Sequence, residues 1–166
     1  IFRLIRISVN YNYGGIDTGM KLSIQLYSLR AESEKDFVGV LEYVAKLGFQ
    51  GVEFAGYYGL SAEEIRAHLD RLGLVCSSTH TPAPDVFEKT EETIAINKTL
   101  GCKYVIVPWY EIPDAAAAAS LAEKFLAVKE KFAENGLVLG YHNHGAEFNK
   151  ENDTYLLDTL MAKTNR

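Results

Sequence analysis

Four glycines recur along the chain, each at the end of a segment with helical periodicity and each followed within a few residues by a short apolar run. They are Gly48, Gly73, Gly101 and Gly136. Glycine ends a helix easily because it adopts the left-handed conformation that the terminus requires. The repeat, roughly 30 residues long, has the length of one strand–helix unit. It therefore predicts alternating strands and helices, an arrangement that folds into a parallel sheet with helices outside.

The hydrophobic pattern agrees with this alternation. We expect strands at residues 22–28, 51–55, 74–79, 104–107 and 137–142. Between and after these strands, apolar residues recur at helical spacing. They predict helices at residues 37–45, at residues 85–100, from about residue 114, and at residues 155–163. A further helix should begin at Ser61, because Glu64 follows three residues later as in a capping box.

Composition narrows the class of protein. The 166 residues are enough for one domain with a hydrophobic core. The net charge of -5 and the lack of a Lys/Arg cluster argue against a nucleic-acid partner. No apolar run has the length of a membrane span, so no membrane partner is expected. Cys76 and Cys102 show neither metal nor disulfide spacing, which favours buried thiols in a cytoplasmic protein.

The first nineteen residues differ from the rest, because they show no clear period while a regular strand pattern follows Met20. Arg3 and Arg6 interrupt the apolar part, which argues against a signal peptide. We expect residues 1–19 to be a non-native upstream extension and residues 20–166 to be the folded part. A genuine extension that adds a strand at residues 4–9 remains the alternative.

Polar residues mark the carboxyl ends of the predicted strands. Gln25, Glu53, His80 and His142 fall at or near the ends of strands one, two, three and five. An open doubly wound sheet and a (β/α)8 barrel both alternate strands and helices. The first strand lacks a glycine-rich phosphate loop, and barrel enzymes collect their chemistry at the carboxyl ends of several strands. A complete barrel takes about 250 residues, so we predict an α/β fold: a partial TIM (β/α)8 barrel of about five βα units, truncated before strand six.

The fifth strand ends in the polar run Tyr141, His142, Asn143 and His144, with Glu147 close behind. Strand residues i and i+2 lie on one side, so His142 and His144 would face the same way if the strand continues through both. Imidazoles and a carboxylate can hold a divalent metal or move a proton. A pair of hydrogen-bonded histidines is an equally good reading. His68 lies on the inner stripe of a helix and is expected to be structural.

Several stretches together resemble the sugar phosphate isomerase/epimerase family, which has the xylose isomerase-like TIM barrel. They are IQLYSLR (24–30), GVEFAGYYG (51–59), SSTHT (77–81), NKTLGCKYVIVP (97–108) and LGYHNHGAEF (139–148). The resemblance implies an enzyme of carbohydrate metabolism, a metal-dependent sugar isomerase or epimerase. It would abstract a proton next to a carbonyl on a sugar, polyol or keto-sugar. A divalent metal (Mn, Mg, Co or Zn) is implied at the carboxyl mouth of the barrel.

Combining the resemblance with strand position gives a candidate site. We expect Glu53 and His80 to be catalytic, and the remaining residues divide into substrate contacts (Gln25, Trp109 and His144) and metal ligands (His142 and Glu147). The partner would be a small-molecule sugar or keto-sugar, with homo-oligomerisation left open. Because ligands from strands six to eight are not in this sequence, we expect the 166-residue fragment itself to be inactive.

Three alternatives stay open. His142 stands where epimerases of the family carry a glutamate, and a histidine-rich fifth strand looks more like an inosose dehydratase or a keto-sugar lyase. A non-catalytic sugar-binding relative and an endonuclease IV-like phosphodiesterase belong to other classes. The acidic charge counts against the phosphodiesterase.

Overall fold

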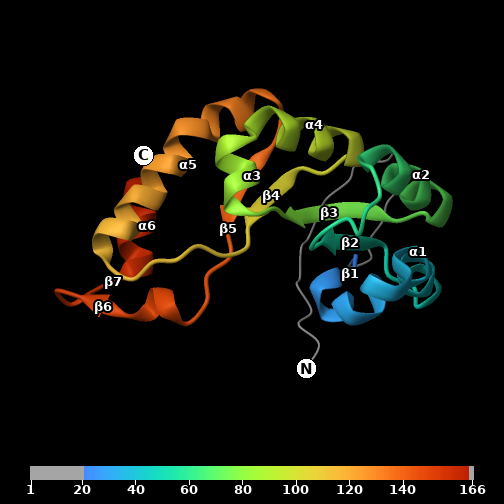
Figure 1. The fold of residues 1–166 in the computed structure, drawn as a ribbon, viewed down its shortest axis with the longest axis horizontal. Coiled ribbons are helices and arrows are strands. Elements are labelled where there is room, and N and C mark those ends of the chain that lie inside the picture. Colours follow the sequence, from blue (N-terminus) through green and yellow to red (C-terminus); the bar gives the residue numbers. More distant parts are fainter. Residues whose placement is uncertain (1–20, 165–166) are drawn as a thin grey trace. The chain divides into compact units, whose positions relative to one another are not determined.

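The computed structural model describes residues 21–164, which divide into two units (Figure 1). The first unit contains the described residues up to His80 together with Ile96–Lys103, and the second contains Thr81–Ala95 and the described residues from Tyr104 onward. Each unit has its own cluster of buried apolar side chains. The predictions for residues 1–19, including the strand at residues 4–9, lie outside the described part of the chain.

The first unit is built on three parallel strands in the order β1-β2-β3. The strands are β1 (Ser23–Gln25), β2 (Gly51–Phe54) and β3 (Val75–His80). Helix α1 (Arg30–Lys46) connects β1 to β2, and α2 (Ala62–Leu72) connects β2 to β3. Parallel strands need a long crossover connection of this kind, because a tight turn would make the next strand antiparallel.

The core of this unit lies on the helix side of the sheet. Side chains alternate along a strand, and Ile24 and Val52 join the buried cluster that also contains Phe37 of α1 and Leu69 of α2. The next residue along each strand lies on the opposite face of the sheet. Gln25 and Glu53 occupy these positions, and both are buried. The strand pattern that builds the core therefore also points two polar side chains away from it.

Helix ends follow the sequence signals closely. The predicted capping box is confirmed at the start of α2: Ser61 Oγ accepts from the Glu64 N–H at 3.2 Å, and Glu64 Oε2 accepts from the Ser61 N–H at 2.8 Å. The glycines predicted to end helices all have positive φ, at 89° for Gly48, 66° for Gly73, 66° for Gly101 and 75° for Gly136.

Two predicted elements differ in kind in the structure, while others differ in their bounds, as does α1, which begins at Arg30 and not at residue 37. Strand one ends at Gln25, and the 3-10 helix η1 (Leu26–Leu29) follows it because the chain turns there to bury Leu26 completely. The helix predicted at residues 85–100 consists of α3 (Ala83–Glu88) and α4 (Thr90–Leu100). They are separated at Lys89, whose φ of −120° and ψ of 43° are not helical. Helix α3 can begin before Asp85 because proline is tolerated in a first helical turn.

The second unit pairs two parallel strands, β4 (Tyr104–Val107) and β5 (Val138–Tyr141). Between them in the chain runs α5 (Ala115–Glu134), whose N-cap Asp114 accepts from the Ala117 N–H at 2.8 Å. Helix α6 (Leu156–Thr164) lies beside α5 (Figure 1). The core combines strand, α5 and α6 side chains, among them Val105, Val107, Leu121, Phe125, Phe132, Leu156 and Leu160.

A short 3-10 helix and a hairpin follow β5, and neither was predicted. The 3-10 helix η2 covers Ala146–Phe148, and the antiparallel hairpin consists of β6 (Lys150–Glu151) and β7 (Thr154–Tyr155). Its two turn residues, Asn152 and Asp153, have φ values of 48° and 62°. Two consecutive positive φ angles are the pattern of a type I′ turn, in which asparagine and aspartate are favoured.

Strands that pair in parallel and alternate with helices make this an α/β protein, which confirms the predicted fold class. Across residues 21–164, the structure contains no helix that is both long and apolar enough to cross a membrane.

Candidate active site

Three of the residues predicted to be functional meet at the carboxyl ends of the strands in the first unit. Gln25 is the last residue of β1, Glu53 is the next to last residue of β2, and His80 is the last residue of β3. Gln25 pairs with Glu53 in the strand register. Because paired residues of parallel strands point to the same face, the register itself brings the amide next to the carboxylate.

Short contacts join these three side chains. Gln25 Nε2 donates to Glu53 Oε1 at 2.7 Å, and His80 Nε2 lies 3.2 Å from the same oxygen. Gln25 Nε2 also lies 3.2 Å from Nδ1 and 3.3 Å from Nε2 of His80. The side chains of Glu53 and His80 are only 5% and 9% exposed. We call these three residues, together with Ser78, the carboxylate cluster.

Ser78 completes the carboxylate cluster, and the sequence did not identify it. Its hydroxyl donates a short hydrogen bond to Glu53 Oε2, so both oxygens of the carboxylate are engaged. Ser78 is 1% exposed. The pair Ser77-Ser78 before His80 was a visible signal, but simple alternation cannot say which serine faces Glu53. The answer depends on an irregularity in the strand register.

A buried carboxylate beside an imidazole can perform acid–base chemistry. Each group can accept or release a proton, and the contact between them fixes the orientation of the ring. Burial removes competing water and strengthens the interaction between the groups. The carboxylate cluster is thus suited to moving a proton at the carboxyl end of the sheet.

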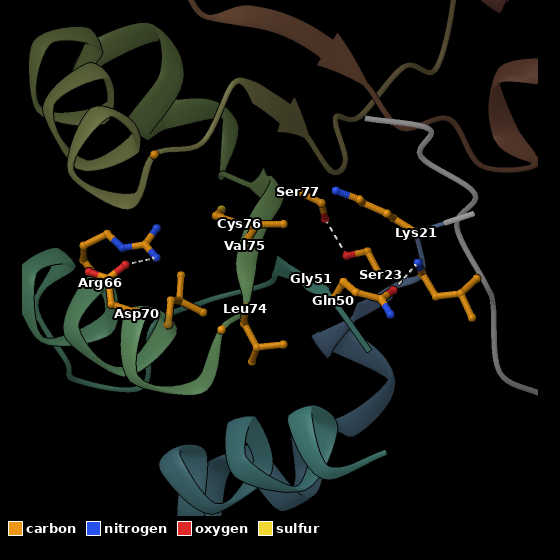
Figure 2. A pocket seen from close by; sticks show the side chains of 14 residues that line it. Lys21, Ser23, Gln50, Gly51, Arg66, Asp70, Leu74, Val75, Cys76 and Ser77 are labelled. Atoms are coloured by element: carbon orange, nitrogen blue, oxygen red, sulfur yellow. Dashed lines mark hydrogen bonds and ion pairs between the residues drawn. The ribbon is translucent and has the colours of Figure 1, made fainter. Parts of the chain in front are cut away.

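The opposite end of the same strands has a different character (Figure 2). A cavity of about 570 Å³ lies there, lined in part by Ser23 and Ser77. The hydroxyls of these serines lie 2.7 Å apart, and Ser77 Oγ also donates to the Val52 carbonyl at 3.0 Å. Arg66, another lining residue, forms an ion pair with Asp70 at 2.6 Å. These hydrogen bonds and the ion pair all join residues of the first unit, which favours a structural role for the side chains.

A second set of polar residues follows β5 in the second unit. Tyr141, the last residue of β5, donates its hydroxyl proton to Glu147 Oε1 at 2.5 Å. The other oxygen of Glu147 accepts from the His144 N–H at 2.8 Å. Glu147 is 1% exposed. Both carboxylate oxygens are therefore used to hold the turn between β5 and η2.

The ionisation of this pair reflects the same contacts. Burial tends to raise the pKa of Glu147, but hydrogen bonds from Tyr141 and from backbone N–H groups outweigh it and leave this pKa below its usual value. Burial and the hydrogen bond to Glu147 raise the pKa of the Tyr141 hydroxyl well above its usual value. Near neutral pH the pair is consequently a phenol that donates to a carboxylate.

The other predicted residues of this unit lie nearer to solvent. His142 is half-buried, and its backbone N–H donates to the Val107 carbonyl at 3.0 Å. The rings of His142 and His144 have centroids 4.8 Å apart, and His144 is exposed. Trp109, predicted to contact the substrate, is 60% exposed. The two rings lie close together, but β5 ends at Tyr141 and so strand alternation does not account for the contact. The substrate-contact roles of Trp109 and His144 stay predictions.

The described residues do not by themselves fit a bound metal ion. No group of three or more His, Cys, Asp or Glu side chains within residues 21–164 is arranged to hold one. Glu147, one of the two predicted ligands, already accepts hydrogen bonds on both oxygens. The divalent metal and the ligand roles of His142 and Glu147 therefore stay predictions.

Comparison with known protein families identifies the family of this chain. The family model described as "Xylose isomerase-like TIM barrel" matches residues 41–161. The chain belongs to this family, and the partial TIM-barrel fold predicted from the sequence agrees with it. No curated protein sequence matches the chain.

Solved structures share the fold at low sequence identity. A sugar phosphate isomerase/epimerase from Parabacteroides distasonis is 24% identical with a TM-score of 0.74, over 92% of this chain and 65% of that chain. The AP endonuclease, family 2, from Brucella melitensis is 20% identical with a TM-score of 0.60, over 78% and 59%. An L-ribulose 3-epimerase is 16% identical with a TM-score of 0.57, over 87% and 57%. The chain thus spans less than two thirds of each of these structures.

These proteins share one fold but are named for different reactions, so the fold alone does not identify the reaction. The reaction has to be inferred from the residues at the carboxyl ends of the strands.

Proposed function

We propose that the protein to which this chain belongs is a sugar isomerase or epimerase that moves a proton on the carbon next to a carbonyl. The observation that carries the proposal is the buried contact between Glu53 and His80 at 3.2 Å, at the carboxyl ends of the strands. That end of the strands is where barrel enzymes hold their catalytic groups. The substrate would be a sugar, a polyol or a keto-sugar.

In the proposed reaction His80 exchanges the proton with the substrate carbon, and Glu53 orients the imidazole. Two contacts favour this division of roles. Glu53 accepts hydrogen bonds from Gln25 and Ser78 on its two oxygens, which hold its carboxylate in place beside the ring. His80 is slightly more exposed than Glu53, and an imidazole can both accept and release a proton. Delivery of a solvent proton to the opposite face gives an epimer. Delivery to the neighbouring carbon, with the hydroxyl proton passing to the former carbonyl oxygen, gives an isomer.

The proposal of a sugar substrate is supported by the family and by the epimerase and isomerase/epimerase structures that share the fold. The net charge of -5 supports a small-molecule substrate over a polyphosphate one, because nucleic acid binding depends on basic surfaces. Elimination of water by the same proton abstraction would give a dehydrated keto-sugar and is distinguished by its product.

The test is solvent deuterium exchange. The full gene product is incubated in D2O with separate ketopentoses, ketohexoses, their phosphates and a keto-inositol, with and without Mn²⁺. Proton NMR then follows loss of the signal next to the carbonyl and identifies the product. We expect deuterium at that carbon together with an epimer or isomer of at least one substrate.

Other outcomes are equally clear. A product with a new double bond and one water fewer would replace the isomerase proposal with a dehydratase. Failure to exchange any of these substrates, accompanied by cleavage of DNA containing an abasic site, would overturn the proposal in favour of a phosphodiesterase.

A further inference from the structure

An irregularity in strand β3 sets which serine meets Glu53. Val52 of β2 pairs with Cys76, but the next residue, Glu53, pairs with Ser78, so Ser77 has no counterpart on β2. One unmatched residue in a strand is a β-bulge, a feature that re-aims side chains and is common beside active sites. As a result Ser77 and Ser78 both contact groups on the sheet face that carries Glu53: Ser77 contacts Ser23 and Ser78 contacts Glu53.

We propose that Ser78 is a positioning residue, which fixes the carboxylate of Glu53 and thereby the imidazole of His80. This inference rests on the proposed function. Ser78 is 1% exposed and its hydroxyl donates to Glu53 Oε2. A residue so deeply buried does not touch substrate, so its effect passes through the carboxylate.

The physical reason is the torsional freedom of a glutamate side chain. The last torsion of glutamate is broad, and hydrogen bonds alone decide the plane of the carboxylate. Gln25 and His80 both contact Oε1 of Glu53, at 2.7 and 3.2 Å, so they hold only one oxygen of the carboxylate. The hydrogen bond from Ser78 holds Oε2, and with both oxygens held the plane of the Glu53 carboxylate is fixed. Without it the carboxylate can rotate, and Oε1 loses its fixed place beside the ring.

The experiment compares two adjacent serines in the full gene product. Ser78→Ala removes the hydrogen bond to Glu53, and Ser77→Ala removes a buried hydroxyl of the same strand that contacts Ser23 and the Val52 carbonyl. The serines are 1% and 5% exposed, so the two truncations are matched in chemistry and burial. Measured quantities are kcat and KM for the substrate found by deuterium exchange, and the thermal midpoint of unfolding.

We expect Ser78→Ala to lower kcat by about 10- to 100-fold, as a small misplacement of catalytic groups does, with KM within about two-fold. Ser77→Ala should leave kcat within about two-fold. Introduced into a Glu53→Gln background, Ser78→Ala should cause no further loss, because residues that act through one another are not additive. Equal kcat in the two serine variants, a change confined to KM, or a full additional loss in the Glu53→Gln background would each overturn the inference.

A second measurement does not depend on activity. Nitrogen-15 NMR of the histidine side chains reports the tautomer and the environment of His80. Ser78→Ala should shift the His80 ring signals, while Ser77→Ala should leave them in place. A shift in a protein that exchanges no sugar would keep the positioning role and reject the proposed function, whereas unchanged His80 signals in Ser78→Ala would reject the positioning role itself.

Discussion

Oε1 of Glu53 lies 3.2 Å from Nε2 of His80, although the two residues stand on different strands of the first unit. Both side chains are more than nine-tenths buried. A carboxylate placed this way supports an imidazole in one orientation, which is the arrangement that proton transfer requires.

Glu53→Gln is the first test of this contact. The substitution keeps the shape of the side chain but replaces a carboxylate oxygen with an NH2 group, which then faces donors on Gln25 or Ser78. We expect kcat for deuterium exchange to fall by about 10²- to 10⁴-fold, the usual contribution of acid–base catalysis. His80→Asn should cause a similar fall, and the double variant should lose little more than either single one.

His68 provides the matched control for the His80 variant. It lies on α2, half-buried, with Nδ1 at 3.3 Å from Arg71 Nη2. His68→Gln should leave the exchange rate within about two-fold, because this histidine is not part of the carboxylate cluster. Loss of activity in His68→Gln equal to that in His80→Asn would mean that the measured effects report folding rather than chemistry.

Acid stability should depend on Glu147. Its pKa in the folded protein is lower than the ordinary value of 4.5, so its ionised form contributes stability at pH values above 4.5. That contribution is lost as the pH falls from 4.5 through the lower folded-state pKa. We expect the unfolding free energy of the wild type, measured by urea titration, to fall more steeply over this range than that of Glu147→Gln.

The outcome for Glu147 also has a control. Glu134→Gln changes an exposed glutamate at the end of α5 and should follow the wild-type acid profile. A Glu147→Gln profile that coincided with the wild-type profile below pH 4.5 would mean that the contacts from Tyr141 and His144 do not stabilise the carboxylate.

The capping box at the start of α2 predicts a stability effect of known size. Ser61→Ala removes the acceptor for the Glu64 N–H, and loss of such a cap costs about 1 kcal/mol. The measurement is the urea midpoint followed by circular dichroism. Ser120→Ala, an exposed serine within α5, is the comparison and should be neutral or slightly stabilising because alanine favours helices. A cost as large in Ser120→Ala would remove the cap as the explanation.

The predicted metal can be tested at His142 and Glu147 separately. Titration of the full gene product with Mn²⁺, followed by electron paramagnetic resonance, gives the affinity of each variant. We expect His142→Ala to weaken Mn²⁺ binding at least about ten-fold if the imidazole is a ligand. Because Glu147 already accepts from Tyr141 and His144, we expect Glu147→Gln to change acid stability more than metal affinity. Equal Mn²⁺ affinity in wild type and His142→Ala would remove His142 from the predicted ligands.

Local signals in the sequence were sufficient for most of the fold. The helix-ending glycines and the Ser61–Glu64 pair act within one turn of chain, and the structure contains each as predicted. The same holds for strand β4, which covers residues 104–107 as expected. Elements decided by tertiary packing were missed: β1 stops early because Leu26 turns into the core, and Lys89 divides one predicted helix into two.

The candidate site was predictable to the extent that strand alternation governs it. Gln25, Glu53 and His80 were placed at strand ends by pattern alone, and the structure brings them into contact. Ser78 could not be chosen over Ser77, because the choice depends on pairing between strands and not on the order of residues within one. Similarly, the hydrogen bonds of Glu147 depend on the turn after β5, which no periodic pattern describes.

The unmatched Ser77 has a consequence for how this strand tolerates change in length. Removing Ser77 would restore regular pairing, with Cys76 still opposite Val52 and Ser78 still opposite Glu53, so every later side chain of β3 would keep its face of the sheet. His80 would still face Glu53, and Thr79 would still face Asn97, to which it now donates at 2.8 Å. The unmatched serine is thus a position at which β3 could lose a residue and still present the same side chains to Glu53.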